Sequence, residues 1–402
     1  MAACRAHDPR DALRRGAGVI GVVIADAGSR SRVLGLPIAH RAVLALQAAG
    51  VDRVLVLGAE NVGIASDLAN DARRRVDVVA ADRWPAGSTL VVGSALVVDA
   101  NALRGLSSAE PESAARDWRG RVVAAHTLRE GASLESLAIE RVASVPGVLV
   151  AADDADGRAR ATRALLASLR KPMDGWISRS LNRPISLFCT RILVRTGIRP
   201  NALSLAVLAI GIVAGVLASR GSYATLAIGG VLFQLQSILD GCDGELSRLT
   251  FRGSRLGEWL DTIGDDITNY GYFAGAALGV AAMWHSLLPM WVGAAGVSCG
   301  IVASGIEYRY LIAIGSGDLL KYPLGFGSDP EPVVAPTGLA RMLGALRPLL
   351  KRDTFVFAAM LAALAGSVAT FGMLALFAGG AFATLTAVLA SEMRRKFRVP
   401  GG

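Results

Sequence analysis

The sequence predicts a two-part protein, with an N-terminal cytoplasmic α/β domain followed by an all-α integral membrane domain of six transmembrane helices. Hydrophobic residues make up 52% of the 402 residues and charged residues 19%, and the mean hydropathy is +0.45. These values are too apolar for an ordinary soluble chain and too charged for a chain that lies wholly in a membrane. Strand-like and helical stretches alternate over residues 1–170, and six apolar segments of spanning length follow from residue 200.

The first part is expected to form a parallel sheet that is covered on both faces. Its first run, Val19–Ala25, is continuously apolar and β-branched, as in a buried strand. Helical periodicity follows over Ile38–Ala49 and stops at Gly50. Further strand-like runs are Arg53–Gly58, Val76–Ala80, Thr89–Val98, Arg121–Ala125 and Gly147–Ala151. Strands that alternate with helices in this way are typical of a parallel sheet.

Residues 171–199 predict a basic amphipathic helix that lies along the membrane surface, with a solvated linker helix as the alternative. The six predicted spans after it are Ala202–Ala218, Tyr223–Leu239, Leu260–Trp284, Leu288–Leu311, Thr354–Ala369 and Phe371–Ala390. Only a weak break around Gly366 and Gly372 separates the last two, so one long helix is an alternative. The even number, with both termini on the same side, favours six.

The net charge of +9 is better explained by the membrane than by nucleic acid, because the chain contains no recognisable nucleic-acid motif. Among the short connections on one side of the predicted spans, only Arg220 is basic, whereas the opposite side is rich in arginine and lysine. This asymmetry predicts that the α/β domain and both termini face the cytoplasm. The four cysteines are scattered, which argues against a disulfide framework.

Four aspartates gather where the second span ends and the third begins. Asp240 and Asp243 are three residues apart, and Asp261 and Asp265 are four apart, so each pair shares one face of a helix. A short turn at residues 252–254 would bring the two pairs face to face. Solvated carboxylates at the membrane surface are the simpler alternative.

Four converging carboxylates would repel one another unless cations neutralised them. Hard oxygen ligands select Mg²⁺, Mn²⁺ or Ca²⁺, and we expect two divalent cations, Mg²⁺ first among them. Two such ions could hold a pyrophosphate and stabilise charge on both the attacking and the leaving oxygen.

The pattern D-x2-D-G-x2-A-R-x8-G-x3-D-x3-D is that of the CDP-alcohol phosphotransferase family, also called CDP-alcohol phosphatidyltransferases, and the chain from Lys171 to its C-terminus resembles that family. The matching residues are Asp240, Asp243, Gly244, Arg248, Gly257, Asp261 and Asp265. Ser247 stands where the family has Ala. The resemblance implies metal-dependent transfer of a phospho-alcohol group from a CDP-alcohol to an acceptor hydroxyl, with release of CMP, in a protein that is usually a homodimer.

The resemblance also implies a role for each matching position. Asp240, Asp243 and Asp261 would bind metal, and Asp265 would share the second metal and act as general base on the acceptor hydroxyl. The residues implied in binding the CDP group are Asn201, Asp240, Asp243, Gly244, Ser247, Arg248 and Gly257. Among these, Gly244 and Gly257 would leave room for the cytidine, and Arg248 would pair with the pyrophosphate. Asp266 lies outside the pattern and is expected to be structural.

The donor could be CDP-diacylglycerol or a soluble CDP-polyol, and the acceptor a polyol or a polyol phosphate. Basic residues on the predicted cytoplasmic side are candidates to bind an acceptor phosphate, and each could instead anchor lipid headgroups. They are Arg252, Arg255, Arg309, Arg341, Lys351 and Arg352.

The junction K-P-x-D-G-x2-S-R-x2-N-R, which begins at Lys171, resembles that of proteins in which an inositol-1-phosphate cytidylyltransferase domain precedes a di-inositol-phosphate-phosphate synthase domain. The front domain resembles a sugar-phosphate nucleotidyltransferase, but Arg30 replaces a loop glycine, Leu36 stands where Lys is usual before Pro37, and Ser94 stands near the place of a metal-binding Asp. We therefore expect a degenerate domain. The alternatives are an active bifunctional enzyme and a non-catalytic membrane scaffold or transporter.

Overall fold

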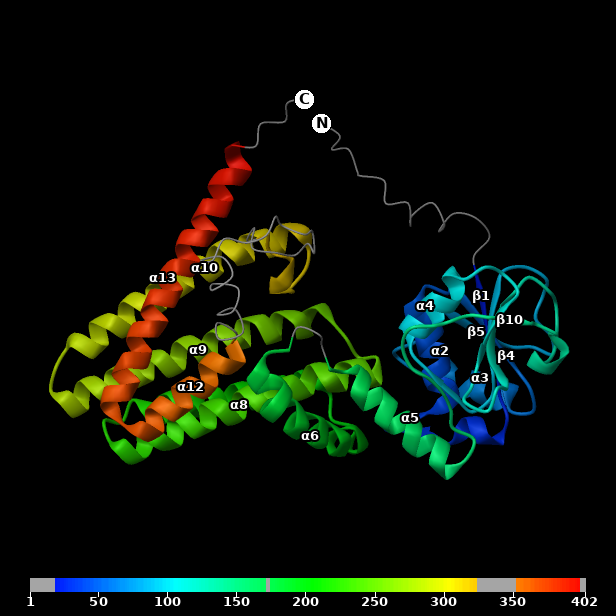
Figure 1. The fold of residues 1–402 in the computed structure, drawn as a ribbon, viewed down its shortest axis with the longest axis horizontal. Coiled ribbons are helices and arrows are strands. Elements are labelled where there is room, and N and C mark those ends of the chain that lie inside the picture. Colours follow the sequence, from blue (N-terminus) through cyan, green and yellow to red (C-terminus); the bar gives the residue numbers. More distant parts are fainter. Residues whose placement is uncertain (1–18, 171–173, 324–351, 398–402) are drawn as a thin grey trace. The chain divides into compact units, whose positions relative to one another are not determined.

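The computed structural model describes residues 19–170, 174–323 and 352–397 (Figure 1). Arg341 and Lys351 therefore lie outside the described residues. The contacts within the chain divide it into two units, Met1–Leu169 with Leu249–Phe251, and Arg170–Arg248 with Arg252–Gly402. Each unit is described by itself below.

The N-terminal unit is built on a seven-stranded sheet with the order β10-β8-β9-β6-β1-β4-β5. Its strands are β1 (Ile20–Ile24), β4 (Arg53–Leu57), β5 (Asp77–Ala80), β6 (Thr89–Val92), β8 (Ser113–Arg116), β9 (Val122–Thr127) and β10 (Arg141–Val142). Two small two-stranded sheets pair β2 (Arg32–Val33) with β3 (Leu36–Pro37) and β7 (Leu96–Val98) with β11 (Leu149–Ala151).

The sheet is mixed, so the prediction of a parallel sheet was wrong. Strands β6, β1, β4 and β5 run parallel, but β9 pairs antiparallel with both β6 and β8. The reason is a tight hairpin between β8 and β9, in which the Asp117 carboxylate accepts hydrogen bonds from the backbone N–H groups of Arg119 and Arg121. A hairpin of this kind can join only antiparallel strands. The sequence of β8, Ser-Ala-Ala-Arg, has no β-branched residue and gave no strand signal.

Both faces of the sheet are covered, as the sequence predicted. On one face, apolar residues of α2 (Ile38–Ala49), α3 (Asn61–Ala69) and α4 (Ala100–Ser108) form one buried cluster with the strands. On the other face, Trp84 packs with residues of the 3₁₀ turn η3 (Leu134–Ser136) and the segment after it. The unit ends in α5 (Ala155–Ser168).

The C-terminal unit is helical (Figure 1). After the π-helical turn η4 (Ser178–Asn182), its helices are α6 (Arg183–Thr196), α7 (Pro200–Ala218), α8 (Tyr223–Thr250), α9 (Arg255–Trp284), α10 (Leu288–Ile314), α12 (Arg352–Ala365) and α13 (Ser367–Phe397). Among the described residues, four helices are long and apolar enough to cross a membrane, namely α7, α8, α10 and α13.

Each of the six segments expected to span the membrane is helical in the structure, from α7 to α10 and in α12 and α13. The last two are separate helices, because the chain breaks at Gly366, whose φ of +107° lies in the left-handed region that favours glycine. The weak break in the sequence is therefore a real interruption, and a single long helix is excluded.

Glycines bring α7 and α9 into close contact. A Cβ atom added to Gly275 of α9 would lie only 2.1 Å from the backbone oxygen of Gly215 in α7. Beside this contact, Phe233, Tyr272, Phe273 and Phe377 form a buried aromatic cluster in which two ring pairs stack, with centroids 4.1 and 4.2 Å apart. Close backbone approach at small residues is typical of helix packing in membranes.

From Trp176 to the end of α6, several apolar side chains are exposed and several polar ones are buried. Trp176, Ile185, Phe188 and Ile192 are exposed, whereas Asn182, Ser186 and Thr190 are buried against the other helices. A helix with this arrangement is suited to lipid on its outer face and to a polar interior on its inner face.

Candidate active site

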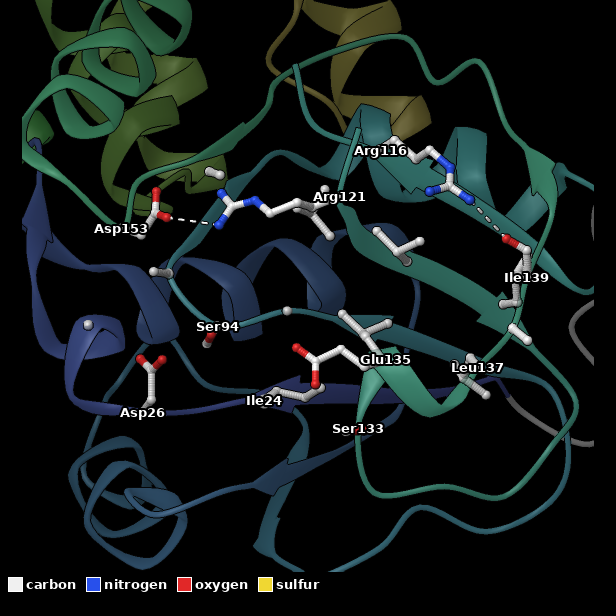
Figure 2. Close-up of a pocket in the computed structure, with 18 of the residues that line it drawn as sticks. Ile24, Asp26, Ser94, Arg116, Arg121, Ser133, Glu135, Leu137, Ile139 and Asp153 are labelled. Atoms are coloured by element: carbon white, nitrogen blue, oxygen red, sulfur yellow. Dashed lines mark hydrogen bonds and ion pairs between the residues drawn. The ribbon is translucent and has the colours of Figure 1, made fainter. Parts of the chain in front are cut away.

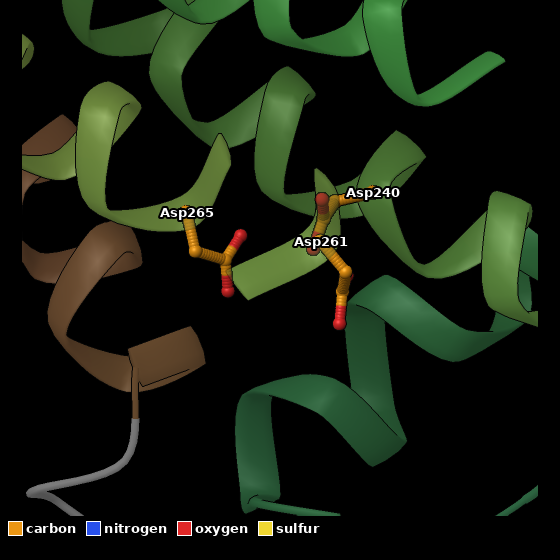
Figure 3. Close-up of side chains that lie close together, drawn as sticks. All are labelled: Asp240, Asp261 and Asp265. Carbon is orange, nitrogen blue, oxygen red and sulfur yellow. The ribbon is translucent and has the colours of Figure 1, made fainter. Parts of the chain in front are cut away.

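The carboxylates of Asp240, Asp261 and Asp265 converge (Figure 3). Asp240 lies near the C-terminal end of α8, and Asp261 and Asp265 lie one turn apart on α9, so the two helices present them to the same space. One oxygen from each carboxylate lies within 4.8 Å of the other two, a spacing that could hold a metal ion. The structure thus brings together three of the four predicted aspartates.

The fourth, Asp243, lies outside this group and is almost fully buried. Its carboxylate accepts hydrogen bonds from the Ser204 hydroxyl of α7 and from the backbone N–H of Gly244. Asp243 is therefore held between α7 and α8 in this structure, one turn of α8 away from Asp240.

Arg352, the first residue of α12, lies against the aspartate group. Its guanidinium forms ion pairs with Asp240, at 3.1 Å from Nη1 to Oδ2, and with Asp265, at 2.7 Å from Nη2 to Oδ1. Nη2 also donates to the Gln236 side chain at 3.4 Å. A single arginine thus provides positive charge for two carboxylates that would otherwise repel each other.

The residues present fit a divalent cation. Three carboxylates supply hard oxygen ligands, which Mg²⁺, Mn²⁺ and Ca²⁺ prefer. The Asp265 Oδ1 atom is buried and, among the described residues, receives no hydrogen bond even though Arg352 lies close by. The Arg352 guanidinium compensates only part of the negative charge of the three carboxylates, which leaves oxygens to bind a divalent cation.

Next to the aspartates, Asn201 at the start of α7 meets the first turn of α9. A Cβ atom added to Gly257 would lie 3.1 Å from the Asn201 side-chain oxygen and 3.3 Å from the Ser254 hydroxyl, so this glycine permits a tight contact. The Ser254 hydroxyl also accepts a hydrogen bond from the Gly257 N–H and so caps α9.

Gly244 has more space. The nearest atoms to a Cβ added there belong to the Arg248 guanidinium, at 3.5 and 3.9 Å, which are ordinary contact distances. Arg248 itself is exposed, and Ser247 is half-buried one residue before it. The protein alone therefore does not require glycine at position 244.

Four of the six basic residues proposed for an acceptor phosphate lie among the described residues. Arg252, Arg255 and Arg309 are exposed, and Arg252 donates only a long hydrogen bond, 3.5 Å, to the Gly197 carbonyl. Arg352 is the described candidate that contacts the aspartate group.

The sequence analysis did not identify a second cluster of polar side chains, which lies around Glu245 of α8. Glu245 of α8 is fully buried and accepts hydrogen bonds from Ser186 at 2.8 Å, Thr190 at 2.7 Å and Arg183 at 2.7 Å. Arg183 also forms an ion pair with Asp174 at 2.9 Å. Two features of the sequence could have indicated this cluster, namely a glutamate within an apolar helix, Glu245, and the Asn182-Arg183 pair in the junction. Asp266, expected to be structural, accepts a hydrogen bond from the Tyr308 hydroxyl at 2.6 Å.

The N-terminal unit has a pocket of its own, with a volume of about 940 Å³ (Figure 2). Asp26 and Ser94 line one end of it, and Arg121 crosses it to form an ion pair with Asp153 at 3.1 Å. Arg121 donates hydrogen bonds to the carboxylates of Asp117 and Asp153, and these bonds raise the pKa of Arg121, which therefore stays charged. Both arginines that line the pocket already have protein partners, since Arg116 donates to the carbonyl of Ile139.

Arg30, which stands in place of a loop glycine, does not line this pocket. It forms ion pairs with Glu60 at 2.7 Å and Asp67 at 3.2 Å, and these interactions raise its pKa although its side chain is well exposed to solvent. The loop keeps its turn because Asp26 and Ser29 cap each other at the 3₁₀ turn η2 (Ala27–Arg30).

Comparison with known proteins bears on the helical unit. Residues 198–390 match the family model described as CDP-alcohol phosphatidyltransferase. Curated relatives include proteins named bifunctional IPC transferase and DIPP synthase. That of Archaeoglobus fulgidus is 36% identical over 120 residues, covering 30% of this chain and 24% of its own length. That of Rubrobacter xylanophilus is 33% identical over 172 residues, covering 43% and 37%.

These matches span only about a quarter to about a third of the relatives' own lengths. Among solved structures, phosphatidylinositol phosphate synthase of Mycobacterium tuberculosis with CDP-DAG bound aligns with a TM-score of 0.39 at 17% identity, over 52% of this chain and 92% of its own. The converging aspartates and the Asn201–Gly257 contact all lie inside the matched segment. The helical part of this chain thus carries, over residues 198–390, a domain of the CDP-alcohol phosphatidyltransferase family.

Proposed function

We propose that the protein is an integral membrane, metal-dependent CDP-alcohol phosphotransferase that transfers a phospho-alcohol group from a CDP-alcohol to an acceptor hydroxyl and releases CMP. The observation that carries this proposal is the convergence of Asp240, Asp261 and Asp265 within 4.8 Å, inside the segment that matches the family model. A scaffold or transporter would gain nothing from three carboxylates gathered in this way.

In the proposed reaction, the acceptor oxygen attacks the phosphorus that carries the alcohol, and the bond from that phosphorus to the bridging oxygen of CMP breaks. Asp265 takes the proton of the attacking hydroxyl. Divalent cations bound by the aspartates would neutralise them and stabilise negative charge on the phosphate oxygens. Asp240 and Asp261 would hold these cations, with Asp243 joining them once it gives up its bond to Ser204.

We place the CDP group on the side of the site where Asn201 meets Gly257. Gly244 fits this role because its free space opens next to the Arg248 guanidinium, which is able to donate two parallel hydrogen bonds to a pyrophosphate. Ser247 lies beside them. Both a lipid-linked and a soluble CDP-alcohol fit the proposal, so CDP-diacylglycerol and CDP-inositol are both included in the experiment below.

Six spans, with the site and both termini in the cytoplasm, complete the proposal. It is supported by the four helices that are long and apolar enough to cross a membrane, by the helical form of the other two segments, and by the excess of basic residues on one side. We propose that the bound cation is Mg²⁺ and that the protein assembles as a homodimer. The names of the relatives favour inositol-phosphodiester synthesis as the setting, with phospholipid synthesis as the alternative.

The test is CMP release by the full chain in detergent, with Mg²⁺, CDP-diacylglycerol or CDP-inositol, and a panel of polyols and polyol phosphates. Asp265→Asn is expected to lower the rate about a hundredfold or more, because the general base is lost. The matched control is Asp266→Asn, which changes the neighbouring carboxylate that accepts from Tyr308. Equal CMP release by the wild type and Asp265→Asn would refute the catalytic assignment.

A further inference from the structure

The last two residues of α8, Leu249 and Thr250, and the residue after them, Phe251, belong to the N-terminal unit. Leu249 and Thr250 are buried, and Phe251 packs against the apolar cluster that α2 forms with the sheet. The helix that carries the first half of the aspartate motif therefore ends among residues of the α/β fold.

Two arginines of the N-terminal unit bind the carbonyl groups at this helix end. Arg41 of α2 donates from Nη1 to the Leu249 carbonyl at 3.0 Å and from Nη2 to the Val33 carbonyl at 3.1 Å. Arg73 donates from Nη1 to the Thr250 carbonyl at 3.1 Å. The last carbonyls of an α-helix have no partner within the helix and lie at the negative end of its dipole. Both arginines thus supply the donors and the positive charge that the end of α8 needs.

Both arginines are themselves fixed in place. Arg41 is only 1% exposed, and burial lowers its pKa to about 10, so it remains charged at neutral pH. Its guanidinium lies 5.9 Å from the centroid of the Phe251 ring. Arg73 is paired with Asp71, at 2.8 Å from Nε to Oδ1. Turning either guanidinium away would leave a carbonyl of the helix end without its donor.

The backbone of Phe251 indicates that contacts outside α8 hold this turn. Its φ of +54° lies in the left-handed region, which glycine adopts readily just after a helix and a bulky residue does not. The Phe251 side chain packs against the apolar cluster of the N-terminal unit, and this packing offsets the cost of the backbone conformation.

We propose that the N-terminal unit fixes the end of α8, and that Arg41 and Arg73 are positioning residues for Arg248. This role rests on the proposed function, in which Arg248 binds the pyrophosphate of the CDP-alcohol. Leu249 directly follows Arg248, so loss of order in the last turn of α8 would move the guanidinium away from the bound pyrophosphate. Asp240 lies more than two turns before the helix end and is expected to keep its place.

The N-terminal unit would then serve the transferase through structure, whether or not it turns over a nucleotide. A contribution to stability alone would lower the midpoint of thermal unfolding and the amount of active enzyme, and it would leave the KM values unchanged. A positioning role instead raises the KM for the donor, because Arg248 contacts the donor in the proposed site.

The test is Arg73→Ala in the full chain in detergent. CMP release is measured against the concentration of the CDP-alcohol that the wild type turns over, CDP-diacylglycerol or CDP-inositol, and then against that of the acceptor. We expect the donor KM to rise about tenfold and the acceptor KM to stay unchanged. Arg73→Lys is expected to recover part of the donor KM, because its ammonium group is able to donate to the Thr250 carbonyl.

The matched control is Arg74→Ala, since Arg74 donates to the carbonyls of Val76 and Ala69 and not to α8. Equal donor KM values for the wild type and Arg73→Ala would overturn the proposal, as would an equal rise in Arg74→Ala. If Arg73→Ala does not fold, Phe251→Gly replaces it, because glycine keeps the left-handed turn and removes only the ring contacts.

If the wild type releases no CMP, the proposed function fails, and the hold on α8 is tested separately by hydrogen–deuterium exchange. The backbone amides of residues 245–252 are compared in the wild type and the two alanine variants. Faster exchange in Arg73→Ala than in both the wild type and Arg74→Ala supports the hold on the helix end, and equal exchange refutes it.

Discussion

Arg352 carries a positive charge at the place where the carboxylates converge. It contacts Asp240 and Asp265 at 3.1 and 2.7 Å, and removing it would leave two partly buried carboxylates side by side. Among the described basic residues suggested for an acceptor phosphate, its position makes it the strongest candidate. A phosphate arriving at the site would meet a guanidinium that lies next to the proposed general base.

The spacing of the aspartates could be converted to geometry, because residues three or four apart share a helix face. The arrangement of Asp243, Arg352 and Glu245 could not be derived in this way. Each depends on a partner from another helix, namely Ser204 of α7, the aspartate group, and Arg183 with Thr190 of α6. The spacing of residues along the sequence shows which side chains share a face of one helix, but it does not show which side chains of another helix they contact.

The Gly244→Ala variant tests whether glycine at this position is required for folding or for binding of the CDP-alcohol. A Cβ atom at Gly244 meets the nearest protein atom at 3.5 Å, so the variant is expected to fold and keep its thermal stability. If the nucleotide needs this space, the KM for the CDP-alcohol rises about tenfold or more. Gly305→Ala, where a Cβ atom has no neighbour within 4 Å, is the control. An unchanged donor KM would remove Gly244 from the CDP site.

At the scale of elements, the contact between α7 and α9 fixes the site. Helix α7 supplies Asn201 and Ser204, and α9 supplies Gly257, Asp261 and Asp265. Apolar length predicted both helices, but not how closely they pack, because that depends on which glycines face each other across the contact. The sequence analysis also missed the β8–β9 hairpin. Its antiparallel pairing depends on the turn at Asp117, which the composition of the strands does not indicate.

Gly275→Val is expected to separate α7 from α9. The added side chain would collide with the backbone oxygen of Gly215, which cannot move without its helix. We expect a loss of stability of about 1–3 kcal/mol, seen as a lower midpoint of thermal unfolding in detergent, and weaker binding of CDP-alcohol. The control on the same helix is Gly271→Ala, where a Cβ atom has no neighbour within 4 Å. Equal midpoints for the two variants would contradict the close-packing account.

At the scale of the whole molecule, the front domain is α/β, as its alternating pattern indicated, although its sheet is mixed and not parallel. It has a pocket, but no described arginine that lines the pocket is free to bind a triphosphate. Among the described residues that line it, both arginines are engaged with the protein, and Arg30 lies elsewhere, paired with Glu60 and Asp67. This supports a domain that no longer makes a CDP-alcohol. Sequence departures suggested this, and the geometry gives them a physical reason.

The full chain is therefore expected to release no pyrophosphate from CTP in the presence of Mg²⁺ and any polyol phosphate. Pyrophosphate release is measured next to CMP release from a CDP-alcohol in the same preparation, so that an inactive preparation is recognised. Ser94→Asp, which restores a carboxylate near the expected metal position, is a second arm. Turnover of CTP by the wild type would establish a bifunctional enzyme instead.

The carboxylate of Asp353 accepts a hydrogen bond from the Ser178 N–H, and its neighbour Arg352 contacts the aspartates. Two consecutive residues thus connect the junction segment to the chemistry. The division of the chain after Leu169 therefore keeps the junction segment with the helices that it bonds to. A gene fragment meant to encode the helical unit alone must begin before Asp174, because a later start would remove the segment that bonds to Asp353 and, through Arg183, to Glu245.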